Sequence, residues 1–156
     1  MNFHRLRILI ISLTSIILLV IVSVAVFNYI YWNDVLKTNN KFIFAWGTYS
    51  YSDYSKYPDR VKPFLESTFF SDNFLGEENL RSNEIIGGNL TAQEKVVNVS
   101  NIKVTKRIFT NGSYVLNSTY TETDVVLGEK STESRSIAVT FHKDTGVYLV
   151  SDVVYE

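Results

Sequence analysis

The chain has 156 residues, a formal net charge of −1 and no cysteine. The balanced charge excludes the strongly basic surface of a nucleic-acid-binding domain, so we expect no nucleic-acid partner. The lack of cysteine excludes disulfides, thiolate nucleophiles and cysteine-ligated metals. Apart from an apolar N-terminal stretch, the length is enough for one domain with its own core.

Residues 8–33 form an apolar stretch without a single charged side chain. As a helix they would span ~39 Å at ~1.5 Å per residue, more than the ~30 Å of bilayer hydrocarbon. Apolar side chains occupy every side of that helix, which is typical of a helix surrounded by lipid. We therefore predict a transmembrane helix over residues 8–33, with the lipid bilayer as a partner.

The flanks of this stretch predict its orientation. Arg5 and Arg7 lie in the short segment 1–7, and positive charge favours the cytoplasmic side. Tyr29, Tyr31 and Trp32 lie at the other end, where aromatic side chains are typical of the membrane–water interface. The prediction is a single-pass protein of the cell membrane with a cytoplasmic N-terminus and an extracytoplasmic C-terminal domain.

A cleaved signal peptide is the alternative to an anchor. Ser23-Val24-Ala25 has small residues at the two positions that a signal peptidase reads. The apolar stretch continues through Phe27 and Ile30 instead of giving way to polar residues, which favours the anchor. Both alternatives export the domain.

After a polar juxtamembrane linker at residues 34–41, a domain is predicted over residues 42–156. Phe42, Trp46, Tyr49 and Asp53 follow the i, i+4, i+7, i+11 spacing of one helix face, although Gly47 interrupts it. Such a face usually packs on a sheet. The alternative is a ligand-binding face, for which the candidates are Trp46, Tyr49, Asp53 and Tyr54.

A second helix is predicted from Asp59 to Phe70, because residues 61, 64, 65 and 69 form one apolar face. The residue before Pro58 avoids helical dihedral angles and separates the two helices. Residues 71–95 contain several glycines and charges, and they predict a long loop with one short strand near Ile85 and Ile86.

From Val96 onward the apolar period changes to two, which is typical of strands. A phase slip at Asn101-Ile102 predicts a bulge, and Asn111-Gly112 is a strong hairpin signal. Further turns are expected at residues 127–130 and 144–146. The predicted fold class is α+β, with two helices packed on a curled antiparallel sheet of about four strands.

The exported part offers no convergent set of catalytic groups. His142 is its one histidine, without acidic residues at ligand spacing, so we expect no metal site and no cofactor. We predict that the protein is not an enzyme. The best candidate for a catalytic base, if there is one, is Asp53 on the aromatic face.

Two stretches carry a resemblance to a known family. FAWGTYSYSDYSKYPDRVKPFLESTFF at residues 44–70 and VTFHKDTGVYLVSDVVYE at residues 139–156 follow a single N-terminal pass. This layout is similar to the NTF2-like (cystatin-like) superfamily, and within it to the VirB8-like subunits of type IV secretion and related Gram-positive conjugation proteins. The family often has tryptophan where this chain has Tyr148.

The resemblance implies a non-catalytic scaffold or assembly subunit of an envelope-spanning complex, such as a type IV secretion or conjugation system. Such a subunit self-associates and binds other envelope proteins. A second hypothesis is an extracytoplasmic accessory domain that binds an apolar small molecule in the cone between the first helix and the sheet. A third is an NTF2-like enzyme that uses Asp53.

Overall fold

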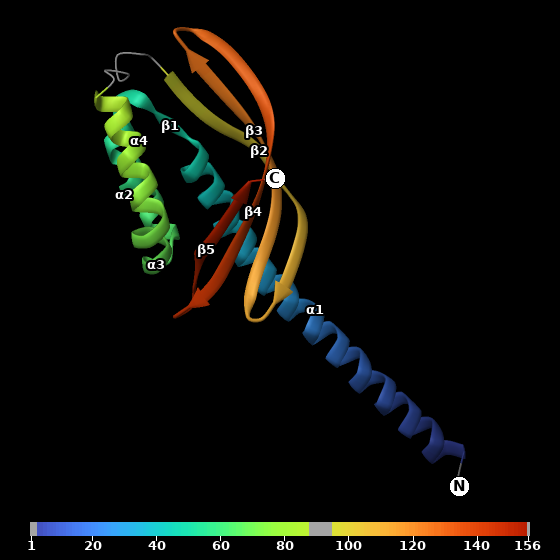
Figure 1. Ribbon diagram of the computed structural model, residues 1–156. Helices are drawn as coiled ribbons and strands as arrows, with labels where there is room; N and C mark the ends of the chain where they lie inside the picture. The colour runs from blue at the N-terminus through green and yellow to red at the C-terminus, as the bar shows by residue number, and fades with distance from the viewer. Residues whose placement is uncertain (1–2, 88–94, 156) are drawn as a thin grey trace. The chain divides into compact units, whose positions relative to one another are not determined.

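The computed structural model describes residues 3–87 and 95–155. The chain divides into two compact units, Met1–Asp34 and Val35–Glu156, which are described separately. One helix, α1, covers Phe3–Gly47 and contributes to both units. A five-stranded sheet and a layer of short helices make up the rest of the second unit (Figure 1).

The first unit is the apolar part of α1. Its large apolar side chains are exposed from Ile10 to Ile30, as expected where lipid and not protein is the surrounding medium. Among the described residues, one helix, over Ile10–Gly47, is long and apolar enough to cross a membrane. The predicted span over residues 8–33 lies largely within this helix, and both the membrane crossing and its direction stay predictions.

Helix α1 is continuous through Phe42, and residues 34–41, predicted as a linker, lie within it. The expectation of a separate helix beginning at Phe42 was wrong. The helix continues without a break because its buried face already begins at Val35. Val35, Asn39, Phe42 and Ile43 are all fully buried, and they follow the i, i+4, i+7, i+8 spacing of one helix face. This stripe packs the second unit's part of the helix onto the sheet.

The sheet is an antiparallel meander in the order β1-β2-β3-β4-β5. Its strands are β1 (Tyr49–Ser50), β2 (Lys95–Thr110), β3 (Ser113–Val126), β4 (Glu129–Asp144) and β5 (Val147–Tyr155). The four long strands are strongly curled, and the short helices lie on one side of them (Figure 1). The predicted α+β class and curled sheet are confirmed.

The connections between the long strands are tight turns with positive φ. Asn111 and Gly112 have φ values of 50° and 79°, the conformation that an Asn-Gly hairpin turn requires. Asn101 has a φ of 53°, and the register between β2 and β3 shifts between Ser100 and Lys103. The predicted hairpin and the predicted bulge are both confirmed.

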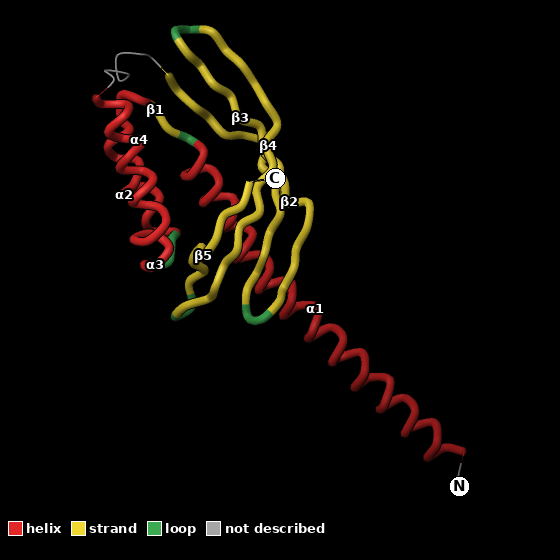
Figure 2. The backbone as a smooth tube through the Cα atoms, in the orientation of Figure 1, coloured by secondary structure: helices red, strands yellow, loops and turns green. Residues whose placement is uncertain are grey.

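The helical layer is more broken than the periodicity predicted (Figure 2). It consists of a 3₁₀ segment Tyr51–Lys56, α2 (Tyr57–Val61), a 3₁₀ turn Lys62–Phe64, α3 (Ser67–Phe69), a π-helical turn Phe70–Phe74 and α4 (Leu75–Gly87). The prediction of a continuous helix over Asp59–Phe70 was therefore wrong. Leu65 is extended, with φ −99° and ψ 144°, because it bridges to Val150 of β5.

The short strand expected near Ile85 and Ile86 was also wrong, because both residues lie in the 13-residue helix α4. Phe74, Glu78 and Ile85 are buried, at the i, i+4, i+11 spacing of one helix face. A glutamate occupies a position of that face where an apolar residue is usual, which obscures the pattern in the sequence.

The core lies between the sheet and the helical elements of the second unit. Alternate residues of the long strands are buried: Val97, Val99, Leu116, Ser118, Tyr120, Ile137, Val139, Phe141, Tyr148 and Val150. Phe42 packs edge-on against Phe141 with ring centroids 6.4 Å apart, and Phe64 approaches Phe42 at 6.2 Å. The period-two pattern of the sequence therefore identifies the face that meets the helices.

Candidate functional site

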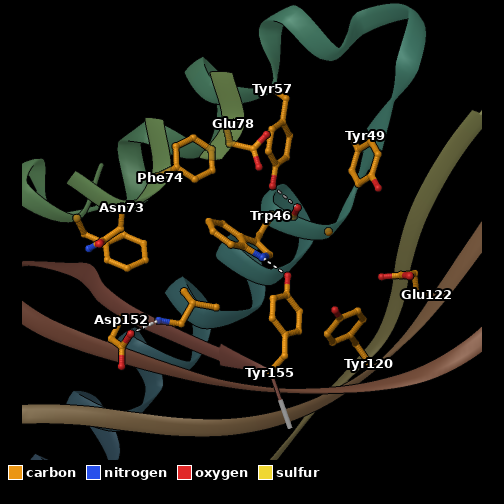
Figure 3. Close-up of a pocket in the computed structure, with 13 residues that line it drawn as sticks. Trp46, Tyr49, Tyr57, Asn73, Phe74, Glu78, Tyr120, Glu122, Asp152 and Tyr155 are labelled. Atoms are coloured by element: carbon orange, nitrogen blue, oxygen red, sulfur yellow. Dashed lines mark hydrogen bonds between the residues drawn. The ribbon is translucent and has the colours of Figure 1, made fainter. Parts of the chain in front are cut away.

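A pocket of about 420 Å³ opens beside the C-terminal end of α1, within the second unit (Figure 3). It is bounded by α1, the helical layer and the strands β3 and β5. Its lining residues are Trp46, Gly47, Tyr49, Tyr57, Phe69, Asn73, Phe74, Glu78, Tyr120, Glu122, Asp152, Val153 and Tyr155. The volume is within the range of small-molecule sites.

The end of α1 positions the pocket wall. A Cβ atom at Gly47 would collide with the side chain of Val99, so only glycine lets the helix approach β2 so closely. The helix ends there, and Tyr49 pairs with Val97 as the first residue of β1. The predicted continuation of the helix to Asp53 was wrong for this reason.

Trp46 lies at the centre of the lining. Its indole Nε1 donates a hydrogen bond of 2.6 Å to the hydroxyl of Tyr155, and its backbone carbonyl accepts one of 2.6 Å from the hydroxyl of Tyr57. Figure 3 shows both bonds, which connect the helix end to β5 on one side and to α2 on the other. The indole ring is therefore held by Tyr155, and the backbone that carries it is held by Tyr57.

Aromatic rings from three parts of the chain surround this tryptophan. The Trp46 ring lies 5.4 Å from Phe74, and Tyr57 lies 5.9 Å from Phe74 and 5.7 Å from Tyr49. These separations are typical of interacting aromatic pairs, which are stiff as well as apolar. The pocket wall is thus a connected cluster of rings.

Three carboxylates also line the pocket. Glu78 is buried and accepts a hydrogen bond of 2.5 Å from the Tyr54 hydroxyl. Glu122 lies 3.4 Å from the guanidinium of Arg135, whose pKa this carboxylate raises further. Asp152, on β5, is exposed. None of the described residues that line the pocket is lysine, arginine or histidine.

The pKa of the Tyr120 hydroxyl shows that this part of the pocket wall disfavours negative charge. Burial raises the pKa of its hydroxyl well above the ordinary value, and the nearby Tyr155 and Glu122 raise it further. The hydroxyl is therefore a neutral donor over the whole physiological range. Both causes mean that additional negative charge is unfavourable at this position.

The four ligand candidates from the sequence are not all in the pocket. Trp46 and Tyr49 line it, whereas Tyr54 is buried behind the wall, where it holds Glu78. Asp53 is 54 % exposed and pairs with Lys56 at 2.6 Å, outside the lining. Ligand binding by any of the four stays a prediction.

The lining residues that the sequence analysis did not predict come from the helical layer and from the strands. Tyr120, Glu122, Asp152 and Tyr155 belong to β3 and β5, and the alternation of these strands marks Tyr120 only as a core residue. Nothing local in the sequence brings Tyr155 to Trp46, because 109 residues separate them. The available signal was the pair of turns predicted at residues 127–130 and 144–146, which place these strands in one antiparallel sheet.

The remaining candidates lie elsewhere. His142 is exposed on β4, and its Nδ1 lies 2.7 Å from a carboxylate oxygen of Glu66. Among residues 3–87 and 95–155, no three His, Cys, Asp or Glu residues are grouped so as to hold a metal ion. The absence of a metal site and of a cofactor stays a prediction.

The candidates for the membrane interface lie on α1. Arg5 and Arg7 are in its first turns, Tyr29 is 72 % exposed, and Tyr31 and Trp32 are half-buried. Their positions at the two ends of the apolar stretch agree with the predicted interface role, which itself stays a prediction.

Several solved structures have a fold similar to that of this chain. No protein-family model matches the chain, and no curated protein matches its sequence. The solved structures that it resembles include the VirB8 protein of Agrobacterium tumefaciens, with a TM-score of 0.57, 16% identity, and coverage of 80% of this chain and 90% of that one. An IcmL-like type IV secretion system protein from Legionella pneumophila has a TM-score of 0.59 and 12% identity, and the match covers 81% of this chain and 91% of that one.

The periplasmic domain of DotI is a further similar structure, with a TM-score of 0.56, 17% identity, and coverage of 78% of this chain and 92% of that one. These similarities cover about four fifths of this chain and nearly the whole of each solved chain. The described domain has the NTF2-like fold of the VirB8-like type IV secretion proteins.

Proposed function

We propose that the protein is a non-catalytic, membrane-anchored scaffold or assembly subunit of an envelope-spanning complex of the type IV secretion or conjugation kind. The observation that carries the proposal is the combination of one apolar N-terminal helix with a domain whose fold matches the VirB8 protein and an IcmL-like type IV secretion system protein. The catalytic candidate Asp53 adds no support for an enzyme, because it is solvent-exposed and paired with Lys56.

In this proposal residues 8–33 cross the cell membrane once and residues 42–156 are extracytoplasmic. The apolar helix fits the span by length, and Arg5 and Arg7 favour a cytoplasmic N-terminus. The lack of cysteine fits a domain that is held together by packing alone. Recovery of a mature protein that begins after Ala25 would instead support a cleaved signal peptide.

The domain offers exposed apolar side chains for partner proteins or a second copy. Phe44 of α1 is 54% exposed, and Phe109 on β2 is 57% exposed beside the hairpin turn. Large exposed aromatic residues are enriched at protein interfaces. We propose these two residues as contact points for self-association or for other envelope proteins.

Site-specific crosslinking in native membranes tests the scaffold role. A photoreactive amino acid placed at Phe44 or at Phe109 should yield discrete crosslinked species, either dimers or complexes with membrane proteins. A matched control carries the same group at Asp53, which is exposed outside these surfaces. Recovery of monomer alone from both test positions, at the level of the control, would count against the proposal.

The second candidate function is an extracytoplasmic accessory domain that binds a small molecule. The observation that favours it is the pocket itself, because the space between the end of α1 and the sheet is not filled by the protein's own side chains. This function does not require an enzymatic step. Titration of the full chain with small molecules, followed by tryptophan fluorescence, tests it, and the absence of saturable binding would count against it.

A further inference from the structure

The sheet has two faces, and the short helices of the second unit lie on one of them (Figure 1). The buried residues of β3 and β4 point to that side, and the residues that alternate with them point to the other side. At the centre of this second side lie three cross-strand pairs, in which Val115, Asn117 and Thr119 are opposite Thr140, Ala138 and Ser136. We call these six residues the outer face.

The outer face carries no charged side chain, although the two strands that form it are charged. Away from the turns, β3 and β4 hold four charged residues: Glu122, Asp124, Glu133 and Arg135. All four are in phase with the buried residues of these strands, so they belong to the helix-facing side. A sheet face that is exposed to water usually carries the charges, whereas the core of a protein interface is depleted in them. The distribution therefore favours a protein contact on the outer face.

Apolar side chains continue this surface onto the neighbouring strands. The register places Ile108 of β2 beside Val115 and Val154 of β5 beside Ala138. Val154 is 50% exposed, so covering it would remove apolar area from water. Small and β-branched side chains of this kind let a second sheet approach to the ~10 Å separation of packed sheets.

The two borders of the outer face carry opposite charges. Lys103 and Lys106 are exposed on β2 at one border, and Asp152 is exposed on β5 at the other. The Asp152 carboxylate accepts a hydrogen bond of 2.9 Å from the backbone N–H of Val153, which holds it at the edge of the sheet without neutralising its charge. A surface that is basic at one border and acidic at the other is complementary to a second copy of itself turned by 180°.

A two-fold axis that runs along the strands, between β3 and β4, fits this pattern. It places β3 of one copy over β4 of the other, and β2 over β5. Lys106 then meets the β5 border of the second copy at the level of Val154, two residues or about 7 Å from Asp152 and within the reach of a lysine side chain. The axis also leaves Val35, where the chain enters the second unit, at the same level in both copies, as two anchors in one membrane require.

We propose that the outer face is the contact between two copies of the chain, related by this two-fold axis. The inference rests on the self-association that belongs to the proposed scaffold function, and it names the surface that carries it. Four strands ~4.8 Å apart, paired over about eight residues of ~3.3 Å each, bury roughly 500 Å² per copy. This area is near the lower end of specific interfaces, and anchoring of both copies in one membrane raises their effective concentration.

Single-cysteine crosslinking of the full chain in native membranes tests the inference, because the chain has no cysteine of its own. Ala138→Cys places a thiol on the outer face beside the proposed axis, and Ser55→Cys, exposed on the helical layer, is the matched control. Two copies with different epitope tags are expressed together and treated with a short bis-maleimide. We expect Ala138→Cys to give a crosslinked dimer that carries both tags, with a yield several times that of Ser55→Cys.

Charge changes in the Ala138→Cys background locate the contact. Thr119→Glu brings two like charges together near the axis and should lower the dimer yield about tenfold or more. Lys106→Glu and Asp152→Lys should each lower it about threefold, whereas the double variant Lys106→Glu/Asp152→Lys should restore it, because the pairs form again with their charges exchanged. Ser55→Glu is the control and should stay within about twofold of the parent. Circular dichroism confirms that each variant is folded.

The outcomes separate this inference from the scaffold function. A dimer yield for Ala138→Cys no higher than for Ser55→Cys, or a crosslinked species that joins one tagged copy to a different protein, would overturn the inference. A charge-exchanged double variant that stays as low as the single variants would do the same. Dimers through Phe44 or Phe109 without any through Ala138→Cys would overturn the sheet contact and leave the scaffold function standing. The absence of every crosslinked species from these three positions would count against both.

Discussion

The two ends of the contact between α1 and the sheet differ, although one helix and one sheet face form both. At the closed end Asn39 and Phe42 are fully buried against Ser118 and Phe141. At the open end Trp46 is half-buried and borders the pocket, with polar residues of β3 and β5 opposite. The closed end is fully packed, and the open end borders a pocket of about 420 Å³.

The chemistry of the strands explains the difference. Opposite the closed end, Leu116, Val139 and Phe141 are aliphatic or aromatic without polar atoms and fill the space. Opposite the open end, Tyr120 and Glu122 carry polar groups that cannot be packed away without hydrogen bonds. Substitutions along this one contact should therefore have effects that decrease from the closed end to the periphery.

The largest effect is expected from Phe42→Ala. The ring is fully buried between Phe141 and Phe64, so its removal should lower the free energy of unfolding by about 3–5 kcal/mol. Urea unfolding of the full chain in detergent, followed by circular dichroism, measures the change. Phe44→Ala, in the same helix but exposed, should cost less than about 1 kcal/mol. Similar losses for the two variants would contradict the burial of Phe42.

At the boundary between the two ends, Gly47→Ala should cost about 1–3 kcal/mol, because the added Cβ collides with Val99. Gly76→Ala is the control, since a Cβ there meets nothing within 4 Å and alanine is the better helix former. The control should be neutral or slightly more stable in the same unfolding measurement. A neutral Gly47→Ala would mean that the helix does not approach β2 so closely.

The buried polar pair at the closed end should contribute less. Asn39 Nδ2 donates to Ser118 Oγ at 3.1 Å, and Asn39 Oδ1 has no hydrogen-bond partner. Ser118→Ala removes the acceptor and should cost about 1–2 kcal/mol, because a buried amide donor is left without a partner. The double variant Asn39→Leu/Ser118→Ala should lose less unfolding free energy than the sum of the losses of the two single variants. A double-mutant cycle measures this difference. Additive losses would contradict the pairing.

Tyr120 gives the open end a pH dependence. Its pKa is raised in the folded chain, so the unfolded chain releases the phenolic proton at lower pH than the folded chain. The contribution to stability is full below the ordinary tyrosine pKa of about 10 and is lost as pH rises above it, at up to ~1.4 kcal/mol per pH unit. Unfolding measured from pH 8 to 11 should show this fall, and Tyr120→Phe should reduce its slope. An unchanged slope would contradict the burial of the hydroxyl.

The smallest effect is expected outside the contact, at the exposed pair of His142 and Glu66. His142→Ala should change the unfolding free energy by less than about 1 kcal/mol, as is typical of exposed ion pairs. The same urea unfolding checks it. A loss as large as that of Phe42→Ala would show that this surface pair and not the closed end holds the helical layer to the sheet.

Local signals explain which parts of this fold could be predicted. The hairpin at Asn111-Gly112 and the bulge at Asn101 depend on residues that adopt positive φ readily, so the sequence alone indicates them. The buried faces of β3 and β4 follow from strict alternation. The apolar stretch of α1 is equally local, because its length and lack of charge are sufficient.

Long-range contacts explain the rest. The helical periodicity of residues 59–70 is interrupted at Leu65, which forms a β-bridge with Val150. Helix α1 ends at Gly47, where it approaches the side chain of Val99. Neither partner is near in the chain. The pocket combines Trp46 with Tyr155 and Glu122, so local periodicity found two of its lining residues, Trp46 and Tyr49, and placed Asp53 on the same face by assuming that the helix continued.

In the proposed function, the apolar helix tethers the folded domain on the outer side of the membrane. The lack of cysteine makes it directly testable with single-cysteine variants of the full chain. Ser52→Cys places an exposed thiol in the domain, and Asn2→Cys places one before the helix. In intact cells stripped of outer layers, a membrane-impermeant maleimide should label Ser52→Cys at once and Asn2→Cys only after permeabilisation. The reverse pattern, or release of labelled Ser52→Cys protein from washed membranes, would contradict the claim.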